Sequence, residues 1–404
     1  MTAEREGKNR ALLWHEGSPR AGTRELLSWI AAGAAERELR DESPFAQVRA
    51  VADAGLGALA LPVDQGGHGA SIRELLAFVI DLAEADPIVA HVLRTHYSQT
   101  LGFVRGGHTR WLDEVRAGKV FGNAISETGT VAAGNHDFTT TLTETADGRW
   151  LDGVKYYSTG TLYSDWISVA ARVEGDRVAT VLVPTDRPGV EVVDDWDGMG
   201  QSRTGTGTTR FTDVAVADDE FLSVRSRHEP RPAADVPFLQ LYLQALMAGI
   251  LRSVATDAAA LVRSRTRTFD HAPAPRPVDD PILQETVGRL VSTAWVAESA
   301  VLAAADTVQA AEDAVRAGEP TEEVGRAASV AASAVKVHLD RVAADAATSL
   351  FDVGGASASS RGKNLDRHWR NIRTLSLHNP ASYRATALGR LAISGEDLPR
   401  NGYF

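Results

Sequence analysis

The stretch DGVKYYSTGTLYSDWISVAA, residues 152–171, lies near the middle of this 404-residue chain and differs in character from what flanks it. It joins two runs rich in aromatic and β-branched residues through a turn that contains Ser158, Thr159 and Gly160. Runs of this kind, bounded by turn residues, predict β-strands. Similar runs fill residues 120–220, with Ala-Asp-Gly and Glu-Gly-Asp as hairpin-type turns. Strands at this spacing predict a small antiparallel β-barrel.

Helical patterns precede this block. Apolar residues recur at helical spacing in RELLSWIAAGAAERELR and again between Ile72 and Val104, where Pro87 is expected in the first turn of a second helix. LPVDQGGHG, residues 61–69, separates these two regions and is predicted to form a loop because it combines proline with three glycines.

Helical patterns also follow the block. Three long alanine-rich patterns cover residues 237–268, 282–316 and 321–351, and the proline-rich FDHAPAPRPVDDP interrupts them as a loop. The sequence therefore predicts an α+β chain. We expect an N-terminal α-helical domain at 21–119, the β-barrel domain at 120–222, and a C-terminal four-helix bundle with its tail at 223–404. Residues 1–20 are expected to be flexible.

Composition excludes several classes of function. The formal charge is -11, which argues against a nucleic-acid-binding surface. Cysteine is absent, so disulfides and thiolate chemistry are excluded, and no H-E-x-x-H spacing suggests a metal site. We find no uninterrupted apolar run of about 18 residues and expect no membrane span. The charged start MTAEREGKNR lacks the apolar core of a secretory signal, so we expect a cytoplasmic protein.

The segment LDRHWRNIRTLSLHNP, residues 365–380, concentrates positive charge in this acidic chain. Residues 361–404 hold eight Arg or Lys against three Asp or Glu. Arg370 and Arg373 lie one helical turn apart and face the same way. They would complete an anion site or pair with acidic residues of another helix, and the sequence leaves both readings open.

Five phrases occur in a fixed order along the chain: LPVDQGGHG, FGNAISETGT, DGVKYYSTGTLYSDWISVAA, GMGQSRTGTGTTRFTDVAV, and FDVGGAS followed by DRHWRNIRTLSLHNP. In this order, and at these joints between helical and β segments, they resemble the acyl-CoA dehydrogenase superfamily over nearly the whole chain. The resemblance is closest to its reduced-flavin-dependent, dibenzothiophene monooxygenase-like branch. It implies a flavin between the β domain and the C-terminal helices of a homotetramer.

The resemblance also implies which residues hold the flavin ring. Asn123, Ser126 and Thr128 in NAISETGT, with Ser158 and Thr159 in YYSTG, would contact it. Amide and hydroxyl groups suit this role because the ring edge carries several acceptors. The alternative for the Ser and Thr side chains is ordinary turn capping.

By the same resemblance, Arg265 and Arg267 would bind a flavin phosphate, commonly across a subunit interface, and Gly354 and Gly355 would let the backbone approach it. Arg370 would complete this set. Cations at the C-terminal end of a helix are also favourable without any ligand.

The catalytic base of a dehydrogenase is missing. Alignment of RNIRTLSLHN with the family pattern places Asn379 where a catalytic glutamate would stand, and an amide cannot accept a proton at neutral pH. The monooxygenase branch is expected instead to use His378 in SLHNP and His96 in LRTHYSQ. His378 would donate a proton to, or stabilise, a C4a-hydroperoxyflavin, and His96 would orient the substrate or act as a base. Each histidine also has a purely structural alternative.

These observations predict a two-component flavin-dependent monooxygenase that oxygenates sulfur, nitrogen or electron-rich carbon in a small organic substrate. Reduced FMN, with FADH2 as the alternative, and O2 would be consumed. A separate NAD(P)H:flavin reductase would supply the reduced flavin, because no nicotinamide-binding G-x-G-x-x-G unit is visible. The alternatives are an acyl-CoA dehydrogenase or oxidase, and a non-catalytic binding protein on the same fold.

Overall fold

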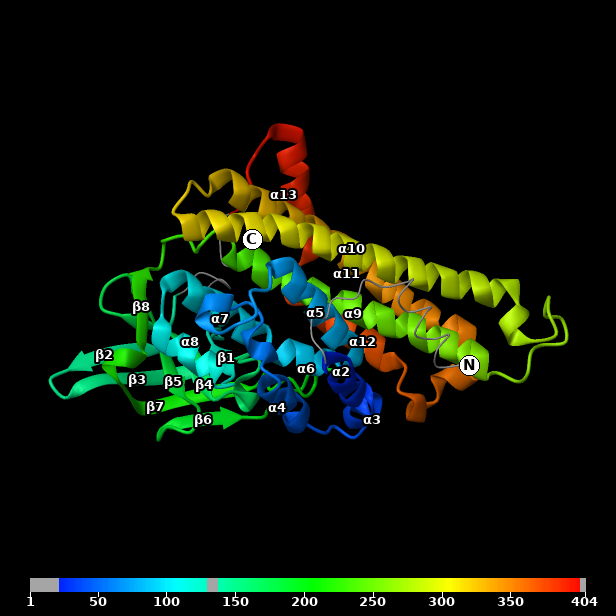
Figure 1. The fold of residues 1–404 in the computed structure, drawn as a ribbon, viewed down its shortest axis with the longest axis horizontal. Coiled ribbons are helices and arrows are strands. Elements are labelled where there is room, and N and C mark those ends of the chain that lie inside the picture. The colour runs from blue at the N-terminus through cyan, green and yellow to red at the C-terminus, as the bar shows by residue number, and fades with distance from the viewer. Residues whose placement is uncertain (1–21, 129–136, 400–404) are drawn as a thin grey trace.

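The computed structural model of the chain describes residues 22–128 and 137–399 (Figure 1). The segment expected to be flexible, 1–20, lies outside the described residues. The first part is helical, as predicted. Its helices are α2 (Thr23–Ala31), α3 (Ala34–Leu39), α4 (Phe45–Asp53), α5 (Ile72–Ala85), α6 (Pro87–Val92), α7 (Arg94–Gly106) and α8 (Thr109–Arg116).

The second part is a β-sheet, placed at one end of the molecule in Figure 1. Its strands are β1 (Phe121–Ala124), β2 (Thr141–Thr145), β3 (Gly148–Lys155), β4 (Trp166–Val173), β5 (Arg177–Pro184), β6 (Val190–Val193), β7 (Thr208–Val216) and β8 (Phe221–Ser226). The strand order is β6-β7-β3-β2-β4-β5-β8, and β1 pairs with β4. Most pairs are antiparallel, as predicted, but β1–β4 and β2–β4 are parallel, so the sheet is mixed.

The third part is helical again. Its helices are α9 (Asp235–Ser264), α10 (Pro281–Ala317), α11 (Glu322–Gly354), α12 (Asp366–Ser376) and α13 (Ala381–Ser394). The three long helices α9, α10 and α11 pack on one another, and α12 lies against α9 and α11. In Figure 1 these long helices extend away from the sheet, and α13 projects from their side. These helices confirm the predicted C-terminal helical part.

Local sequence signals set the helix boundaries. The Ser71 side chain accepts the Glu74 N–H while the Glu74 carboxylate accepts the Ser71 N–H, which forms a capping box at the start of α5. The Asp86 carboxylate caps α6, and Pro87 occupies the first helical position, as predicted. Asp280 and Pro281 repeat this arrangement at the start of α10. These caps fix the starts of helices that the sequence predicted from apolar periodicity.

Helix α9 is the centre of the largest apolar core. It packs on α5 of the N-terminal part as well as on α10 and α11. Gly249 makes the approach to α5 possible, because a Cβ atom there would lie 2.5 Å from the Ile80 carbonyl oxygen. The N-terminal and C-terminal parts therefore share one continuous core.

Two helices of the described chain, α9 and α10, are long and apolar enough by composition to cross a bilayer. In α9, 72% of the most apolar window is buried inside the protein. Its apolar character is accounted for by the core that it forms with α5, α10 and α11.

Candidate active site

A cavity of about 670 Å³ lies where the three parts of the chain meet. Its walls come from α6 and α7, from the residues after β1, from the segment between β6 and β7, from α9, and from the end of α12. Pockets for small molecules and cofactors commonly measure about 300–1,000 Å³ and lie between domains. This is the cavity in which we place the candidate active site.

The sheet side of the cavity is polar. Asn123, Ser126 and Thr159, three of the residues predicted to contact a flavin ring, line it, and Thr206 joins them. The Asn123 Oδ1 atom accepts a hydrogen bond from the Thr95 hydroxyl at 2.5 Å, which orients the amide. The Thr159 and Thr206 hydroxyls are 2.9 Å apart. This wall offers amide and hydroxyl groups in a fixed arrangement.

Aromatic rings stand beside these polar groups. Tyr157 and Trp196 both line the cavity, and their rings meet edge to face with centroids 6.0 Å apart. The Trp196 indole N–H donates to the Gln201 carbonyl oxygen at 3.0 Å. The sheet side therefore fits a flat, hydrogen-bonding heterocycle such as a flavin ring. The Ser158 hydroxyl, buried beside Thr159, has no hydrogen-bond partner among the described residues and is a further group that a bound ring would satisfy.

His378 lines the cavity at the end of α12 and is exposed through it. Enclosure by protein, together with the positive charges of Arg94 and Lys336, lowers the pKa of His378 well below its usual range. The imidazole is therefore neutral at neutral pH and both donates and accepts hydrogen bonds. Next to it, the Asn379 amide donates to the Gln240 side chain at 3.2 Å, so no carboxylate occupies this position.

His91, which the sequence interpretation missed, is the second imidazole on the cavity wall. Burial and the nearby Arg94 lower its pKa to about 3. Its Nδ1 atom lies 2.9 Å from Oε1 of Gln201. With Oε1 as the acceptor, the proton sits on Nδ1 and Nε2 is left as an acceptor.

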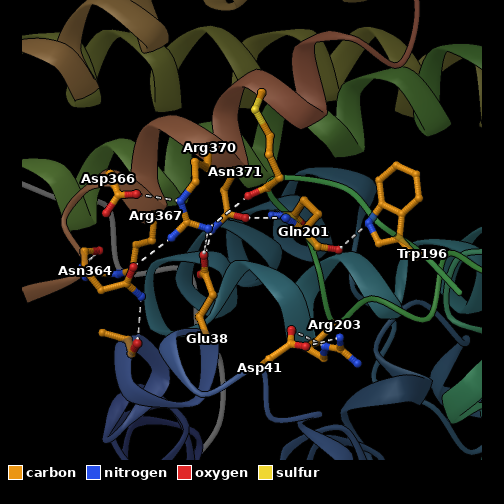
Figure 2. A network of polar contacts seen from close by, with 12 residues as sticks. Glu38, Asp41, Trp196, Gln201, Arg203, Asn364, Asp366, Arg367, Arg370 and Asn371 are labelled. Carbon is orange, nitrogen blue, oxygen red and sulfur yellow. Dashed lines mark hydrogen bonds and ion pairs between the residues drawn. The ribbon is translucent and has the colours of Figure 1, made fainter. Parts of the chain in front are cut away.

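A polar network fixes Gln201 in this position (Figure 2). Gln201 has a φ of 54°, which is unusual for a residue other than glycine. The Asn371 Oδ1 atom of α12 accepts its N–H at 2.6 Å, and Asn371 Nδ2 donates to the Glu38 carboxylate of α3 at 3.0 Å. The approach of this segment to α12 needs Gly200, where a Cβ atom would lie 2.2 Å from the Arg370 carbonyl oxygen. His91 is thus connected through Gln201 and Asn371 to the N-terminal helices.

The position of His96 contradicts the prediction that it contacts the substrate. It is fully buried but does not line the cavity, and its Nε2 lies 3.0 Å from the Gly57 carbonyl oxygen. Its ring packs near Tyr97 and Phe121, with centroids 5.4 and 5.9 Å away. Burial lowers the pKa of His96 to about 4. It directly follows Thr95, which lines the cavity, but its side chain points into the core from another face of α7.

The signal that could have found His91 is helical periodicity. His91, Arg94, Thr95 and Ser98 are spaced i, i+3, i+4 and i+7 across the junction of α6 and α7. All four line the cavity. His96 falls outside this spacing.

Glu127 is the carboxylate on the described cavity wall. Its Oε1 atom lies 2.7 Å from the Lys155 ammonium, and both side chains are almost completely buried. Burial raises the pKa of Glu127, but hydrogen bonds from Lys155 and Thr139 outweigh this effect and hold it at about 2. A carboxylate this weakly basic is a poor acceptor for an acidic carbon-bound proton.

The remaining predicted site residues lie away from this cavity. Thr128 is exposed at the edge of the described segment. Arg265 donates to the Val353 carbonyl oxygen at 2.8 Å, at the end of α11 beside Gly354 and Gly355, and Arg267 is exposed nearby. The structure brings Arg265 together with the glycine pair but not with the cavity of the same chain.

Of the two roles that the sequence left open for Arg370, an anion site or an ion pair with another helix, the structure shows the ion pair. Its guanidinium bonds to Asp366 at 2.8 Å, to Asn364 at 2.8 Å and to the Met199 carbonyl oxygen at 3.0 Å, and it pairs with Glu38 at 3.1 Å (Figure 2). All three nitrogens are used within the chain. Arg370 therefore joins α12 to α3 and to the Gln201 segment, and the prediction that it binds flavin phosphate is not supported.

Comparison with known families identifies the class of protein that this fold and cavity define. The middle domain of the acyl-CoA dehydrogenases matches residues 122–214, and the C-terminal domain of the same family matches residues 241–383. The chain belongs to the acyl-CoA dehydrogenase family.

Individual relatives place the chain in one branch of that family. It is 29% identical to the probable FMNH2-dependent monooxygenase SfnC of Pseudomonas putida, covering 92% of this chain and 93% of the relative. It is 29% identical to a dibenzothiophene monooxygenase of Mycolicibacterium goodii, covering 94% of both. The FMN-bound crystal structure of TdsC from Paenibacillus sp. A11-2 is 28% identical, with a TM-score of 0.86 over 94% of this chain and 98% of TdsC. The branch is that of the reduced-flavin-dependent monooxygenases, as the sequence predicted.

Proposed function

We propose that this chain uses reduced FMN and O2 to transfer one oxygen atom to a small sulfur-containing substrate in the cavity between its three parts. The relatives named above include an FMNH2-dependent enzyme and a dibenzothiophene monooxygenase, which supports FMN and a sulfur substrate. In the net reaction, the substrate gains one oxygen atom, the second oxygen leaves as water, and reduced FMN supplies two electrons.

The observation that carries the proposal is the pair of imidazoles on the cavity wall. His378 and His91 line the cavity, whereas the carboxylate on the described wall, Glu127, is held by Lys155. A dehydrogenase needs a basic carboxylate to remove a proton from its substrate. Oxygen transfer needs uncharged groups that donate and accept hydrogen bonds at the reacting atoms, which a neutral imidazole supplies.

The roles follow from the geometry. His378 would donate a hydrogen bond toward the reacting oxygen and so stabilise negative charge that develops there. His91, with Nδ1 fixed by Gln201, would present Nε2 as an acceptor toward the cavity. Asn123, Ser126 and Thr159 would hold the edge of the flavin ring, and Trp196 would close the cavity beside it.

The flavin phosphate has no ligand among the predicted residues of the same cavity. We propose that Arg265, Arg267, Gly354 and Gly355 serve the cavity of a neighbouring copy in a homotetramer. The clustering of Arg265 with the glycine pair at the end of the bundle supports this arrangement. A separate NAD(P)H:flavin reductase would supply reduced FMN, and the complex would act in the cytoplasm without a membrane span or nucleic acid.

The test uses the full chain with photoreduced FMN and methyl phenyl sulfide. On admission of air, we expect methyl phenyl sulfoxide to form in proportion to the FMN consumed. His378→Ala should lower the rate of sulfoxide formation about 10²–10³-fold, because a positioned hydrogen-bond donor to developing negative charge contributes that much. FMN oxidation should continue and release hydrogen peroxide instead of product.

The matched control is His271→Ala, since that side chain is 81% exposed on a loop outside the cavity wall. Product formation should be unchanged in this variant. Equal coupling of FMN oxidation to sulfoxide in both variants would remove His378 from the reaction. Anaerobic bleaching of bound oxidised FMN by butanoyl-CoA would favour the dehydrogenase alternative.

A further inference from the structure

A chain of threonine hydroxyls runs from Gln201 to the polar wall of the cavity. The Thr204 hydroxyl lies 2.8 Å from the Gln201 carbonyl oxygen and 2.6 Å from the Thr206 hydroxyl. The Thr206 hydroxyl in turn lies 2.9 Å from the Thr159 hydroxyl. Thr204 is fully buried, whereas Thr206 and Thr159 line the cavity. The chain therefore begins inside the protein and ends where a ligand would contact Thr159.

The carbonyl group at the inner end fixes the direction of every hydrogen bond in this chain. A carbonyl oxygen only accepts, and a threonine hydroxyl has a single hydrogen to donate. Thr204 donates that hydrogen to Gln201, so Thr206 must donate to Thr204. The hydrogen of Thr206 is then used, so Thr159 must donate to Thr206. The Thr159 oxygen is left with lone pairs alone and offers a ligand only a hydrogen-bond acceptor.

The inner end of the chain is held firmly. The Gln201 N–H donates to the Asn371 side chain at 2.6 Å, and the Gln201 carbonyl oxygen also accepts the Trp196 indole N–H at 3.0 Å (Figure 2). Gly205, between the two inner threonines, has a φ of 60°, a conformation that glycine adopts without steric cost. The backbone is thereby turned so that the two hydroxyls on either side of Gly205 meet.

Ser158, next to Thr159, differs in this respect. Its side chain is buried, and its hydroxyl has no hydrogen-bond partner among the described residues. That hydroxyl can rotate to donate or to accept, so it suits either kind of ligand atom. Thr159 is therefore the hydroxyl of this pair whose role the protein has already fixed.

The two redox forms of a flavin differ in the hydrogen bonding of one ring nitrogen. N5 of the reduced ring carries a proton and donates, whereas N5 of the oxidised ring has a lone pair and accepts. We propose that Thr204 and Thr206 are positioning residues that keep the Thr159 oxygen an acceptor, so that this wall favours reduced over oxidised FMN. A donor at Thr159 for the oxidised ring would require reversal of the chain and loss of the Thr204–Gln201 hydrogen bond. This inference rests on the proposed function, since it names how the same cavity selects the redox state of its cofactor.

The test is the midpoint potential of FMN bound to the full-length protein, measured by anaerobic spectroelectrochemical titration. The potential of bound FMN relative to free FMN reports the ratio of the two affinities, and a tenfold ratio corresponds to about 30 mV for two electrons. One hydrogen bond contributes roughly 2–10-fold in affinity. Thr204→Val should therefore lower the midpoint potential by about 10–30 mV. Thr204→Ser should leave it unchanged, because serine keeps the hydroxyl.

Thr209→Val is the matched control. Thr209 is also fully buried, but it lies in β7 outside the described cavity wall, and its hydroxyl has no hydrogen-bond partner among the described residues. The midpoint potential of this variant should equal that of the parent protein. Thermal unfolding shows which variants fold. If Thr204→Val does not fold, Thr206→Val interrupts the same chain at the cavity wall and should lower the potential in the same way.

A flavin analogue tests the same point without reduction. 5-DeazaFMN has a C–H group in place of N5 and lacks the lone pair that would face the Thr159 oxygen. By titration calorimetry, oxidised 5-deazaFMN should bind the parent protein roughly 2–10-fold more tightly than oxidised FMN. Thr204→Val should bring the two affinities together. Equal affinities in the parent protein would overturn the inference, and so would a midpoint potential that stays the same or rises in the folded Thr204→Val or Thr206→Val variant.

Oxygen transfer to methyl phenyl sulfide is measured separately with the parent protein. If the potential falls as expected in Thr204→Val but the parent protein forms no sulfoxide, the proposed function fails and the fixed direction of the hydroxyl chain stands. If sulfoxide forms but the potential does not change in the variants, the proposed function stands and this inference fails. A parent protein that binds neither form of FMN would contradict both.

Discussion

Replacement of Asn371 by leucine tests whether the network of Figure 2 holds the three parts of the chain together at the cavity. Asn371 is 1% exposed. Its side chain joins the Gln201 N–H at 2.6 Å to the Glu38 carboxylate at 3.0 Å. Leucine has a similar volume and removes both hydrogen bonds. The variant therefore leaves a buried N–H and one side of a buried carboxylate without these partners.

The expected loss of unfolding free energy follows from these two groups. A buried donor left unsatisfied costs about 1–3 kcal/mol, and a hydrogen bond to a charged group is worth about 1.5–3 kcal/mol. Glu38 keeps its pair with Arg370 at 3.1 Å, so the combined loss should be near the lower end, about 3 kcal/mol. Because Gln201 fixes His91, oxygenation should also slow, by roughly tenfold in kcat for one lost orienting bond.

Urea unfolding followed by circular dichroism measures the stability, and product formation with photoreduced FMN measures the rate. Asn371→Asp is the matched variant, since it keeps the acceptor for the Gln201 N–H but faces Glu38 with a second carboxylate. It should be less stable at pH 8 than at pH 6, because protonation of one carboxyl relieves the repulsion. A loss of less than about 1 kcal/mol in Asn371→Leu would refute the view that this network joins the parts.

Two further predictions concern buried charge and pH. Lys155→Met should lower the unfolding free energy by about 3–5 kcal/mol, because Glu127 loses its buried partner. The double variant Lys155→Met, Glu127→Leu should recover much of this loss. Urea unfolding of both variants measures the two values. The pKa values of His91 and His96 are lowered to about 3 and about 4 in the folded protein, so the unfolded chain binds more protons than the folded one below pH ~6.5. The contribution of these histidines to the free energy of unfolding should be fully present above that pH. It should fall by about 1.4 kcal/mol per pH unit for each histidine as the pH drops from ~6.5 to ~4. Urea unfolding at several pH values measures this slope, and His96→Gln should reduce it.

The sequence predicted the succession of helical, β and helical parts because their signals are local. The capping pairs Ser71–Glu74 and Asp280–Pro281 mark helix starts without reference to the rest of the chain. The parallel pairing of β1 with β4 was missed, since it joins segments that are not neighbours in sequence. Pairing direction depends on the path of the chain between two strands, and residue patterns within each strand do not record it.

The histidine predictions show the same limit at the scale of two consecutive helices, α6 and α7. His378 was placed on the flavin side because its phrase, SLHNP, resembles the monooxygenase branch, and it lines the cavity. His96 was chosen from the phrase around it, and His91, which shares the cavity-facing spacing of Arg94 and Thr95, was not considered. A difference of five residues rotates a side chain by well over a full turn of the helix, so a phrase-level match cannot decide which residue faces a ligand.

Arg370 illustrates the part that only tertiary structure supplies. The sequence left ion pairing and anion binding open because its acidic partner Glu38 lies more than 300 residues away. In the fold, Glu38 is nearly buried and 3.1 Å from the guanidinium, which decides between the two. Helical periodicity in the sequence does not indicate which distant residue such a side chain will pair with.

The cavity is built from stretches that lie far apart in the sequence, and this affects when it forms during synthesis. His91 emerges early in synthesis, Gln201 near the middle and His378 almost last, yet all three must meet before a ligand has a place to bind. A nascent or partly assembled molecule would possess well-formed helices and still have no affinity for ligand. Ligand binding therefore reports that folding is complete. It would distinguish fully folded molecules from partly folded ones, which circular dichroism of the helices alone would count as native.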